Sequence, residues 1–196
     1  MCDLMQTVPP LEPTLWRTCR VLANATRLRV LNEVVKTPDL DVTRLARRLG
    51  LSQPQATQHL RLLQSRGLLH VQRRGRHAFY RGTAEPSVVH ADPLLAAARA
   101  TLDREDLIAD MVRAFTAFTH ERRILVYRAL QAGCKQRGEL AVRTGISPPA
   151  LKRHLRKLSS RGLIALSRSE VQPCVLPPGL LRDLAVIASP QAPPAA

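Results

Sequence analysis

Hydrophobic positions between residues 14 and 66 recur every three or four residues, a period that predicts amphipathic helices. We expect a first helix from Thr14, a second after the break at Asn24, a third over 42–49 and a fourth that begins after Ser52. Asp41 and Ser52 each precede a helix and carry the short polar side chain typical of an N-cap. Helices therefore fill most of this region.

The hydrophobic period changes after the fourth helix. Residues 69–73 and 77–81 have strand-like sequences, and the short Gly-containing turn Arg74-Gly75-Arg76 joins them. This pattern predicts a basic β-hairpin. A helix, a short helix, a turn, a helix and a hairpin follow one another in the winged helix-turn-helix fold. We expect a mainly α-helical chain with small β-hairpin wings.

A segment of this pattern occurs twice along the chain. Residues 45–69 and 140–164 match without a gap at about 14 of 25 positions. Such self-similarity indicates duplicated structural units. The second copy predicts helices over 121–131 and 138–144, and Ser147 is expected to cap a third over 148–161. The chain therefore carries two tandem winged helix-turn-helix units.

The hairpin of the second copy is expected to be degenerate. A strand is predicted over 164–167, but Pro173, Pro177 and Pro178 interrupt the returning strand, because proline cannot donate a ladder hydrogen bond. A last helix is expected over 180–188.

A long apolar stripe runs through residues 93–118 and predicts a linking helix. A stripe of this length needs a partner surface. It packs either against the chain's own domains or against the same helix of a second chain in a homodimer. The expected division is a first domain at 14–86, a linking helix within 87–118, a second, degenerate domain at 119–189, and flexible tails at 1–13 and 190–196.

The charge of the chain favours a polyanionic partner. Thirty Lys and Arg residues against fifteen Asp and Glu residues give a formal net charge of +15 and a pI of about 11.3. No acidic residue lies between Asp41 and Glu85 or between Glu139 and Glu170. These two basic blocks coincide with the repeated segments. We therefore expect double-stranded DNA as the partner.

The repeated unit places particular side chains where DNA contacts form. A recognition helix directs its N-terminal half at base edges in the major groove, while the preceding helix crosses the backbone. Gln can bond bidentately to adenine and Arg to guanine. The expected base-contacting set of the first copy is Ser52, Gln53, Gln55, Thr57, Gln58 and Arg61. Phosphate or minor-groove contacts are expected from Arg44, Arg47, Arg48, Arg74 and Arg76.

At the matching positions the second copy carries Ser147, Lys152, Arg153 and Arg156, so that Lys and Arg replace Thr57 and Gln58. These cations suit phosphate better than adenine. The second unit is therefore expected to add charge and pseudo-symmetry more than sequence discrimination. The alternative is a copy kept only for packing or for dimer formation.

Three segments of the first copy together resemble the ArsR/SmtB winged-helix repressors. They are LANATRLRVL at 22–31, LSQPQATQHL at 51–60, and the hairpin that follows Gly67 and ends at Phe79-Tyr80. The resemblance covers about residues 15–85, and residues 118–166 resemble the same fold more loosely. It implies a repressor of transcription, and the fused pair resembles a single-chain version of the homodimer that such proteins form on palindromic DNA.

The metal sites of that family do not carry over to this chain. Residues 39–45 contain no Cys, and His90 and Asp92 lack a matching His/Glu pair a few turns later. We expect no metal and no cofactor, and the sequence indicates no particular inducer. His59 and His154 recur at one place in the two copies and are expected to be surface or packing residues.

The four cysteines are scattered and form no paired motif. They are interpreted as structural thiols; the alternative is oxidant sensing by Cys2 with Cys19 or by Cys134 with Cys174. Residues 1–13 have neither the basic nor the apolar part of an export signal, and no apolar run has the length of a membrane span. We expect a cytoplasmic protein without a membrane partner.

Other function classes fit the sequence less well. Proteins that bind RNA or single strands stack bases on aromatic rings, and aromatics make up 3% of this chain. A protein-interaction module built on a winged scaffold is a second alternative, against which the two basic blocks argue. The sequence shows no nucleophile elbow, phosphate loop or zinc-protease spacing, so an enzyme is not expected.

Overall fold

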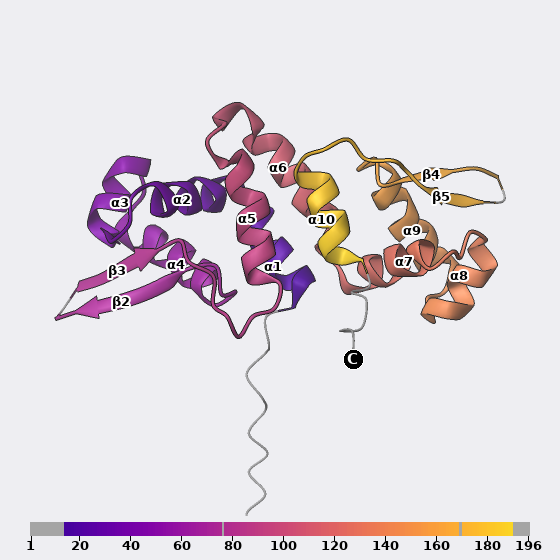
Figure 1. Cartoon of the computed structure of the whole chain (residues 1–196), viewed down its shortest axis with the longest axis horizontal. Helices are drawn as coiled ribbons and strands as arrows, with labels where there is room; N and C mark the ends of the chain where they lie inside the picture. The colour runs from indigo at the N-terminus through magenta and orange to yellow at the C-terminus, as the bar shows by residue number, and fades with distance from the viewer. Residues whose placement is uncertain (1–13, 76, 169, 190–196) are drawn as a thin grey trace, which may run out of the picture.

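Two helical units lie end to end along the long axis of the molecule (Figure 1) in a computed structural model that describes residues 14–75, 77–168 and 170–189. The tails at 1–13 and 190–196 lie outside the described residues. The first unit contains α1 (Leu15–Leu22), α2 (Ala25–Lys36), β1 (Leu40–Asp41), α3 (Val42–Leu49), α4 (Gln53–Gln64), β2 (His70–Arg74), β3 (His77–Arg81) and α5 (Ala91–Leu102).

The second unit begins with a short 3₁₀ turn and repeats the order of helices and hairpin, without a described strand in the place of β1. It contains η1 (Glu105–Leu107), α6 (Ile108–Phe115), η2 (Thr116–Phe118), α7 (Glu121–Gln131), α8 (Arg137–Thr144), α9 (Pro148–Ser159), β4 (Ile164–Leu166), β5 (Val171–Pro173) and α10 (Leu180–Ala188). The expected fold class, mainly α with small β-hairpin wings and two winged helix-turn-helix units in tandem, is confirmed.

Helix boundaries in the first unit follow the local capping signals. The Asn24 side chain accepts a hydrogen bond from the backbone N–H of Arg27 at 2.9 Å, and the Asp41 side chain accepts one from Arg44 N–H at 2.9 Å. Each cap satisfies an N–H group that the first helical turn leaves unpaired. Gly50 ends α3 at φ 63°, a left-handed conformation that glycine adopts without steric cost.

The first wing belongs to a three-stranded antiparallel sheet of order β1-β3-β2. The hairpin register pairs Val71 with Tyr80, and β1 adds Leu40 on the other side of Tyr80. The hydrophobic pattern does not predict β1, because two residues show no alternation. Asp39 turns the chain into this strand at φ 59°. The wing is therefore joined to the helix-turn-helix through α3 as well as α4.

The second hairpin forms despite the prolines expected to interrupt it. β4 and β5 pair antiparallel over three residues, from Ile164 opposite Pro173 to Leu166 opposite Val171. Pro173 occupies the last position of its strand, where a missing N–H is tolerated. The Val171 N–H also donates to Lys135 O at 2.8 Å. The returning strand is thus short, but it is present.

The segment expected to be one long helix is two helices. α5 ends at Leu102, and Arg104 at φ −97°, ψ 92° is extended. The Arg104 guanidinium pairs with Asp106 at 2.8 Å, and Lys36 Nζ pairs with Asp103 at 3.1 Å, so charged side chains hold the turn. The apolar period continues across the turn, which is why periodicity alone does not reveal it.

The apolar stripe of this segment is buried inside the chain. Leu94, Leu102, Phe115 and Phe118 are at most 1% exposed, and α5 packs against α10 while α6 packs against α1 and α10. The face that pointed to a second chain is therefore covered by the chain's own helices, and homodimer formation through 93–118 stays a prediction.

The two units occupy opposite ends of the molecule in Figure 1. The wing β2–β3 points to one end of the molecule and β4–β5 to the other, while α1, α5, α6 and α10 fill the centre. Hydrogen bonds bind the central helices to their units: His90 Nε2 lies 2.9 Å from Thr18 Oγ1, and Arg128 Nε donates to Ala188 O at 2.8 Å.

Candidate nucleic-acid interface

The N-terminus of α4 is fixed by a reciprocal capping box. Ser52 Oγ accepts from Gln55 N–H at 3.3 Å, and Gln55 Oε1 accepts from Ser52 N–H at 3.0 Å. Pro54 lies in the first turn, where no intrahelical N–H is needed. Of the two glutamines at this end, Gln55 is engaged in the cap, while Gln53 Nε2 donates to Thr43 Oγ1 at 3.3 Å.

The exposed face of α4 contains a shallow groove at its surface. Thr57 Oγ1 donates to Gln53 O at 2.8 Å, which turns this hydroxyl back onto the helix. Gln58 and Arg61 are exposed and make no side-chain hydrogen bond to another described residue. The groove is lined by Gln53, Pro54, Thr57, Gln58, Arg61, Leu62 and Ser65. Gln58 and Arg61 are thus the members of the expected base-contacting set whose side chains make no hydrogen bond to another described residue.

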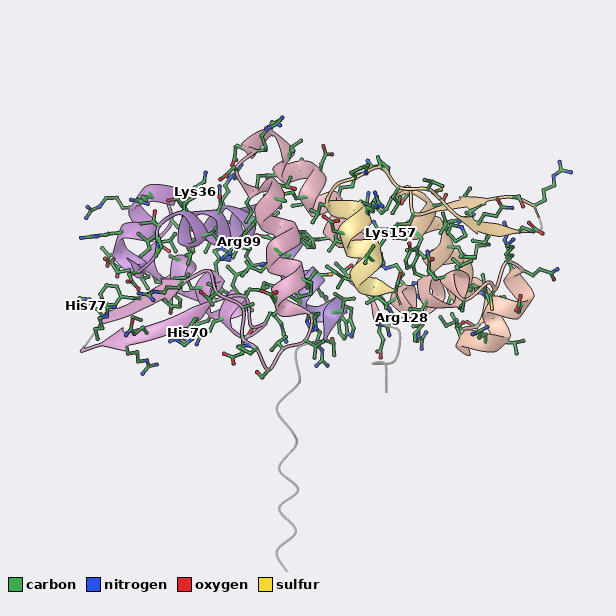
Figure 2. All side chains as sticks on the ribbon, viewed as in Figure 1. Lys36, His70, His77, Arg99, Arg128 and Lys157 are labelled. Atoms are coloured by element: carbon green, nitrogen blue, oxygen red, sulfur yellow. The ribbon has the colours of Figure 1, made fainter. Side chains whose placement is uncertain are left out.

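A second hollow lies between α4 and the wing. Arg61 and Gln64 line it from α4, and Arg73 and His77 line it from the two strands. Arg73 and His77 were not among the expected contact residues. The signal for Arg73 was its position two residues after Val71, which puts both on one face of β2. Figure 2 labels His77 near the end of the wing.

Arg74 is folded back onto its own wing. Its guanidinium donates to Gln72 Oε1 at 2.9 Å, lies 3.7 Å from Asp39 Oδ2 and lies 5.3 Å from the Phe79 ring centre. Asp39 also accepts two hydrogen bonds of 2.7 Å from Arg81. These bonds from Arg81, with the charges of Arg81 and Arg74, hold the pKa of Asp39 below its usual range. Arg76, the other predicted wing residue, lies outside the described residues.

The three arginines of α3 differ in their partners. Arg48 donates to Glu33 Oε2 at 3.1 Å and to Thr37 Oγ1 at 2.8 Å, so it ties α3 to α2. Arg44 lies 3.4 Å from the carboxylate of its own cap, Asp41. Arg47 is exposed and pairs with no carboxylate in the described part of the chain.

The second unit presents a recognition helix with cations and fewer amides. Ser147 occupies the N-cap position of α9, as expected, but its side chain accepts no capping hydrogen bond. Lys152, Arg153 and Arg156 are exposed, and none of them forms an ion pair with a described residue. This helix carries positive charge outward without competing carboxylates.

The hollow between helix and wing recurs in the second unit at matching positions. Lys152 and Arg156 line it where Thr57 and Arg61 line the first hollow, 95 residues earlier. The lining also includes Arg137, together with the apolar residues Ala141, Leu151, Leu155 and Leu166. Arg137 donates to Ser167 O at 2.6 Å and to Arg168 O at 3.2 Å, and it thereby supports the short second wing.

The histidines and cysteines have packing roles in the described structure. His59 and His154 are partly buried, and burial together with nearby cations lowers the pKa of His154 to about 4. Burial raises the pKa of the Cys19 thiol to about 12. Cys134 Sγ donates to Glu139 Oε1 at 3.2 Å, and Cys2 lies outside the described residues. Within the described residues, no group of three or more His, Cys, Asp or Glu side chains is placed to hold a metal.

Two family models match the chain. Residues 24–78 match the model of the MarR family. Residues 120–165 match the model of winged helix-turn-helix DNA-binding domains. The chain is a DNA-binding transcriptional regulator. Searches of curated proteins and of solved structures give no match to this regulator.

The matches confirm the function class and the tandem arrangement of the regulator. They do not confirm the ArsR/SmtB subtype, because the first unit matches the MarR family instead. Both matched families are DNA-binding regulators and not enzymes. Through the described ranges, every helix is too short or too polar to cross a membrane.

Proposed function

We propose that this regulator is a repressor that binds double-stranded DNA as a single-chain counterpart of a winged-helix dimer. The tandem arrangement carries the proposal, because one chain holds two helix-turn-helix units whose wings lie at opposite ends of the molecule. Dimeric helix-turn-helix proteins place their helices in major grooves one helical turn, about 34 Å, apart. Repression is proposed from the resemblance of residues 15–85 to winged-helix repressors.

In this proposal each winged core is preceded and followed in the chain by a central helix: α1 and α5 in the first unit, α6 and α10 in the second. The first domain then extends through α5, and the second begins with α6, with the charged turn at 103–107 between them. The burial of the apolar stripe supports a division here in place of the boundaries at 86 and 119. One chain is then sufficient for two recognition helices.

Within the first unit, Gln58 and Arg61 contact base edges, since their donors are exposed and unused. Ser52, Gln53, Gln55 and Thr57 fix the start of α4 and add contacts from its end. Phosphate contacts come from the cations around the helix and the wing: Arg44, Arg47, Arg48, Arg73, Arg74, Arg76 and His77.

Within the second unit, Ser147, Lys152, Arg153 and Arg156 contact mainly phosphate. Lys152 and Arg153 stand where the first unit has Thr57 and Gln58. A pair of unequal helices calls for an operator whose two halves differ. We therefore propose an asymmetric operator, with stricter sequence requirements at the half-site of α4.

The test is a gel shift of the full chain on genomic fragments, followed by footprinting of the bound fragment. We expect two protected regions one helical turn apart, with one chain bound per operator through its two recognition helices. Base requirements should be stricter in one region than in the other. Two variants compare equivalent positions of the two recognition helices: Gln58→Ala in α4 and Arg153→Ala in α9. Failure to bind any fragment at low salt contradicts the proposal, and equal base requirements in both halves contradict the asymmetric operator.

A further inference from the structure

Three cations gather between α7 and α9 on the inner side of the second unit. Arg123 lies on α7, Lys157 lies in the last turn of α9, and Arg161 lies in the turn that follows α9. The rings of His120 and His154, one turn before Arg123 and Lys157, are 4.7 Å apart, so these two faces pack against each other. We call Arg123, Lys157 and Arg161 the junction cluster.

The junction cluster adjoins the first unit. Arg123 is close enough to Cys19 of α1 for the two groups to interact electrostatically, and burial with the charges of Arg161 and Arg123 lowers the pKa of Lys157. Figure 2 places Lys157 toward the middle of the molecule, away from the second wing. The cluster thus lies on the side of the second unit that is nearer the first unit.

Arg123 is buried, Lys157 and Arg161 are partly buried, and none of the three forms an ion pair with a described carboxylate. Arg123 is 7% exposed; it donates to Thr119 Oγ1, but its Nε has no acceptor, and Arg161 Nε is also buried without one. Among the described carboxylates, Asp110 lines the same cleft as Arg161 and Glu121 acts on His120, yet neither pairs with the cluster.

The two histidines and the cysteine beside the cluster add no negative charge to offset it. Burial with neighbouring cations lowers the pKa of both His120 and His154, so both rings are neutral near pH 7. The Cys19 thiol, with its pKa raised to about 12, is neutral as well. Leaving a buried cation unpaired is costly, because the interior cannot replace its hydration.

The first unit provides an internal comparison. Arg27 is the counterpart of Arg123, since each is the third residue after the N-cap of its helix and each interacts with the recognition-helix histidine. Arg27 donates its Nε to Val21 O, so backbone carbonyls satisfy it. The position of Lys157 is occupied in the first unit by Leu62. Arg66, the counterpart of Arg161, has a buried Nε without an acceptor as well. The extra cation and the unsatisfied Nε of Arg123 are therefore the features particular to the second unit.

We infer that the junction cluster is a binding site for a small oxyanion: inorganic phosphate, or the phosphate or carboxylate group of a metabolite. Such an anion accepts several charge-assisted hydrogen bonds, which matches two guanidinium groups and one ammonium group. Lys157 and Arg161 are partly exposed, which leaves a path from solvent. The bound anion would hold α7 and α9 to α1.

Anion binding is independent of the proposed function, but its consequence rests on it. α9 is the second recognition helix, so an anion that fixes α9 against the first unit sets the distance between the two DNA-contacting surfaces. Binding is therefore measured without DNA, so that its failure and a failure to bind DNA are distinguished.

The experiment is thermal unfolding of the full chain in increasing inorganic phosphate, against sodium chloride of equal ionic strength. We expect phosphate to raise the unfolding midpoint progressively, because a ligand of the folded state stabilises by mass action. Sodium chloride of equal ionic strength should not produce this rise. Arg123→Gln should abolish the phosphate-specific rise. Arg122→Gln, which removes an equal charge from an exposed neighbouring position, should keep it.

Lys157→Leu serves as a second variant, because the first unit folds with Leu62 at this position. It should weaken phosphate binding about tenfold, as expected for one charge-assisted hydrogen bond. Phosphate-specific rises of equal size in the unaltered chain, Arg123→Gln and Lys157→Leu overturn the proposal. So does an unaltered chain that responds to phosphate and chloride alike. If Arg123→Gln does not fold, calorimetric titration of Lys157→Leu with phosphate decides.

Discussion

Removing the three exposed cations of α9 should flatten the salt dependence of DNA binding. The change is Lys152, Arg153 and Arg156 to Gln together. All three are exposed and free of ion pairs in the described structure, so each has its whole charge to offer a phosphate. Because log K falls by about 0.9 per neutralised phosphate, three contacts amount to a slope of about 2.7.

That slope has a large effect over an ordinary salt range. Between about 50 and 200 mM salt, the ratio of unaltered to variant affinity should shrink by about 40-fold. Fluorescence anisotropy with a labelled operator at four salt concentrations measures it. Folding should be nearly unaffected, since surface substitutions of this kind change stability by about 0.5 kcal/mol or less each.

A control variant separates local contacts from net charge. Arg29, Lys36 and Arg104 form ion pairs with the acidic residues around the 103–107 turn, away from the recognition helices. Their replacement by Gln removes the same total charge and should leave the slope within about one unit of the original. An α9 variant with an unchanged slope refutes phosphate contact by the second unit, and equal slope losses in both variants refute the local explanation.

Three further substitutions test the contacts of the first unit. Arg61→Ala should cost about 1–3 kcal/mol on the operator and less on random DNA, in competition binding; equal losses would contradict base contact. Asp39→Asn should lower the unfolding midpoint at pH 7, because an arginine of β3 depresses the pKa of this carboxylate in the folded state. That stabilisation is present above the ordinary aspartate pKa of about 3.9 and is lost as the pH falls through the lower folded pKa, so the two midpoints should converge in acid. Gly67→Ala should cost more than about 1–2 kcal/mol in urea unfolding, because φ is +71° and a Cβ would lie 2.9 Å from Val88 Cγ2. Gly75→Ala, at φ +60° in open space, should show the backbone cost alone, and equal losses would refute the steric part.

Local signals predicted most helices correctly. Asp41 caps α3 and the Ser52–Gln55 box starts α4, as the spacing of these residues indicates. Such signals involve side chains within four residues of one another, so no knowledge of packing is needed. The same holds for Gly50, whose left-handed conformation ends α3.

Tertiary packing determined the elements that local signals did not predict. The helical period runs on from Leu102 to Met111, but the chain turns between them and is held by ion pairs of Arg104 and Lys36. The acidic residues at 103–106 were the available signal for this turn. β1 is too short for any pattern, and the second wing forms because backbone groups of Lys135 and Val171 pair across the unit.

The candidate site divides in the same way. The sequence by itself determined the repeat, the two basic blocks and the residue types on each recognition helix, because these depend only on order and spacing. Only the tertiary structure decided which cations are free: Arg48 is tied to Glu33, whereas Arg61 and Arg156 are not. It also decided that the apolar stripe faces inward and that Arg123 lacks an acceptor. These outcomes depend on residues far apart in the chain, whose distances are set by packing and not by spacing.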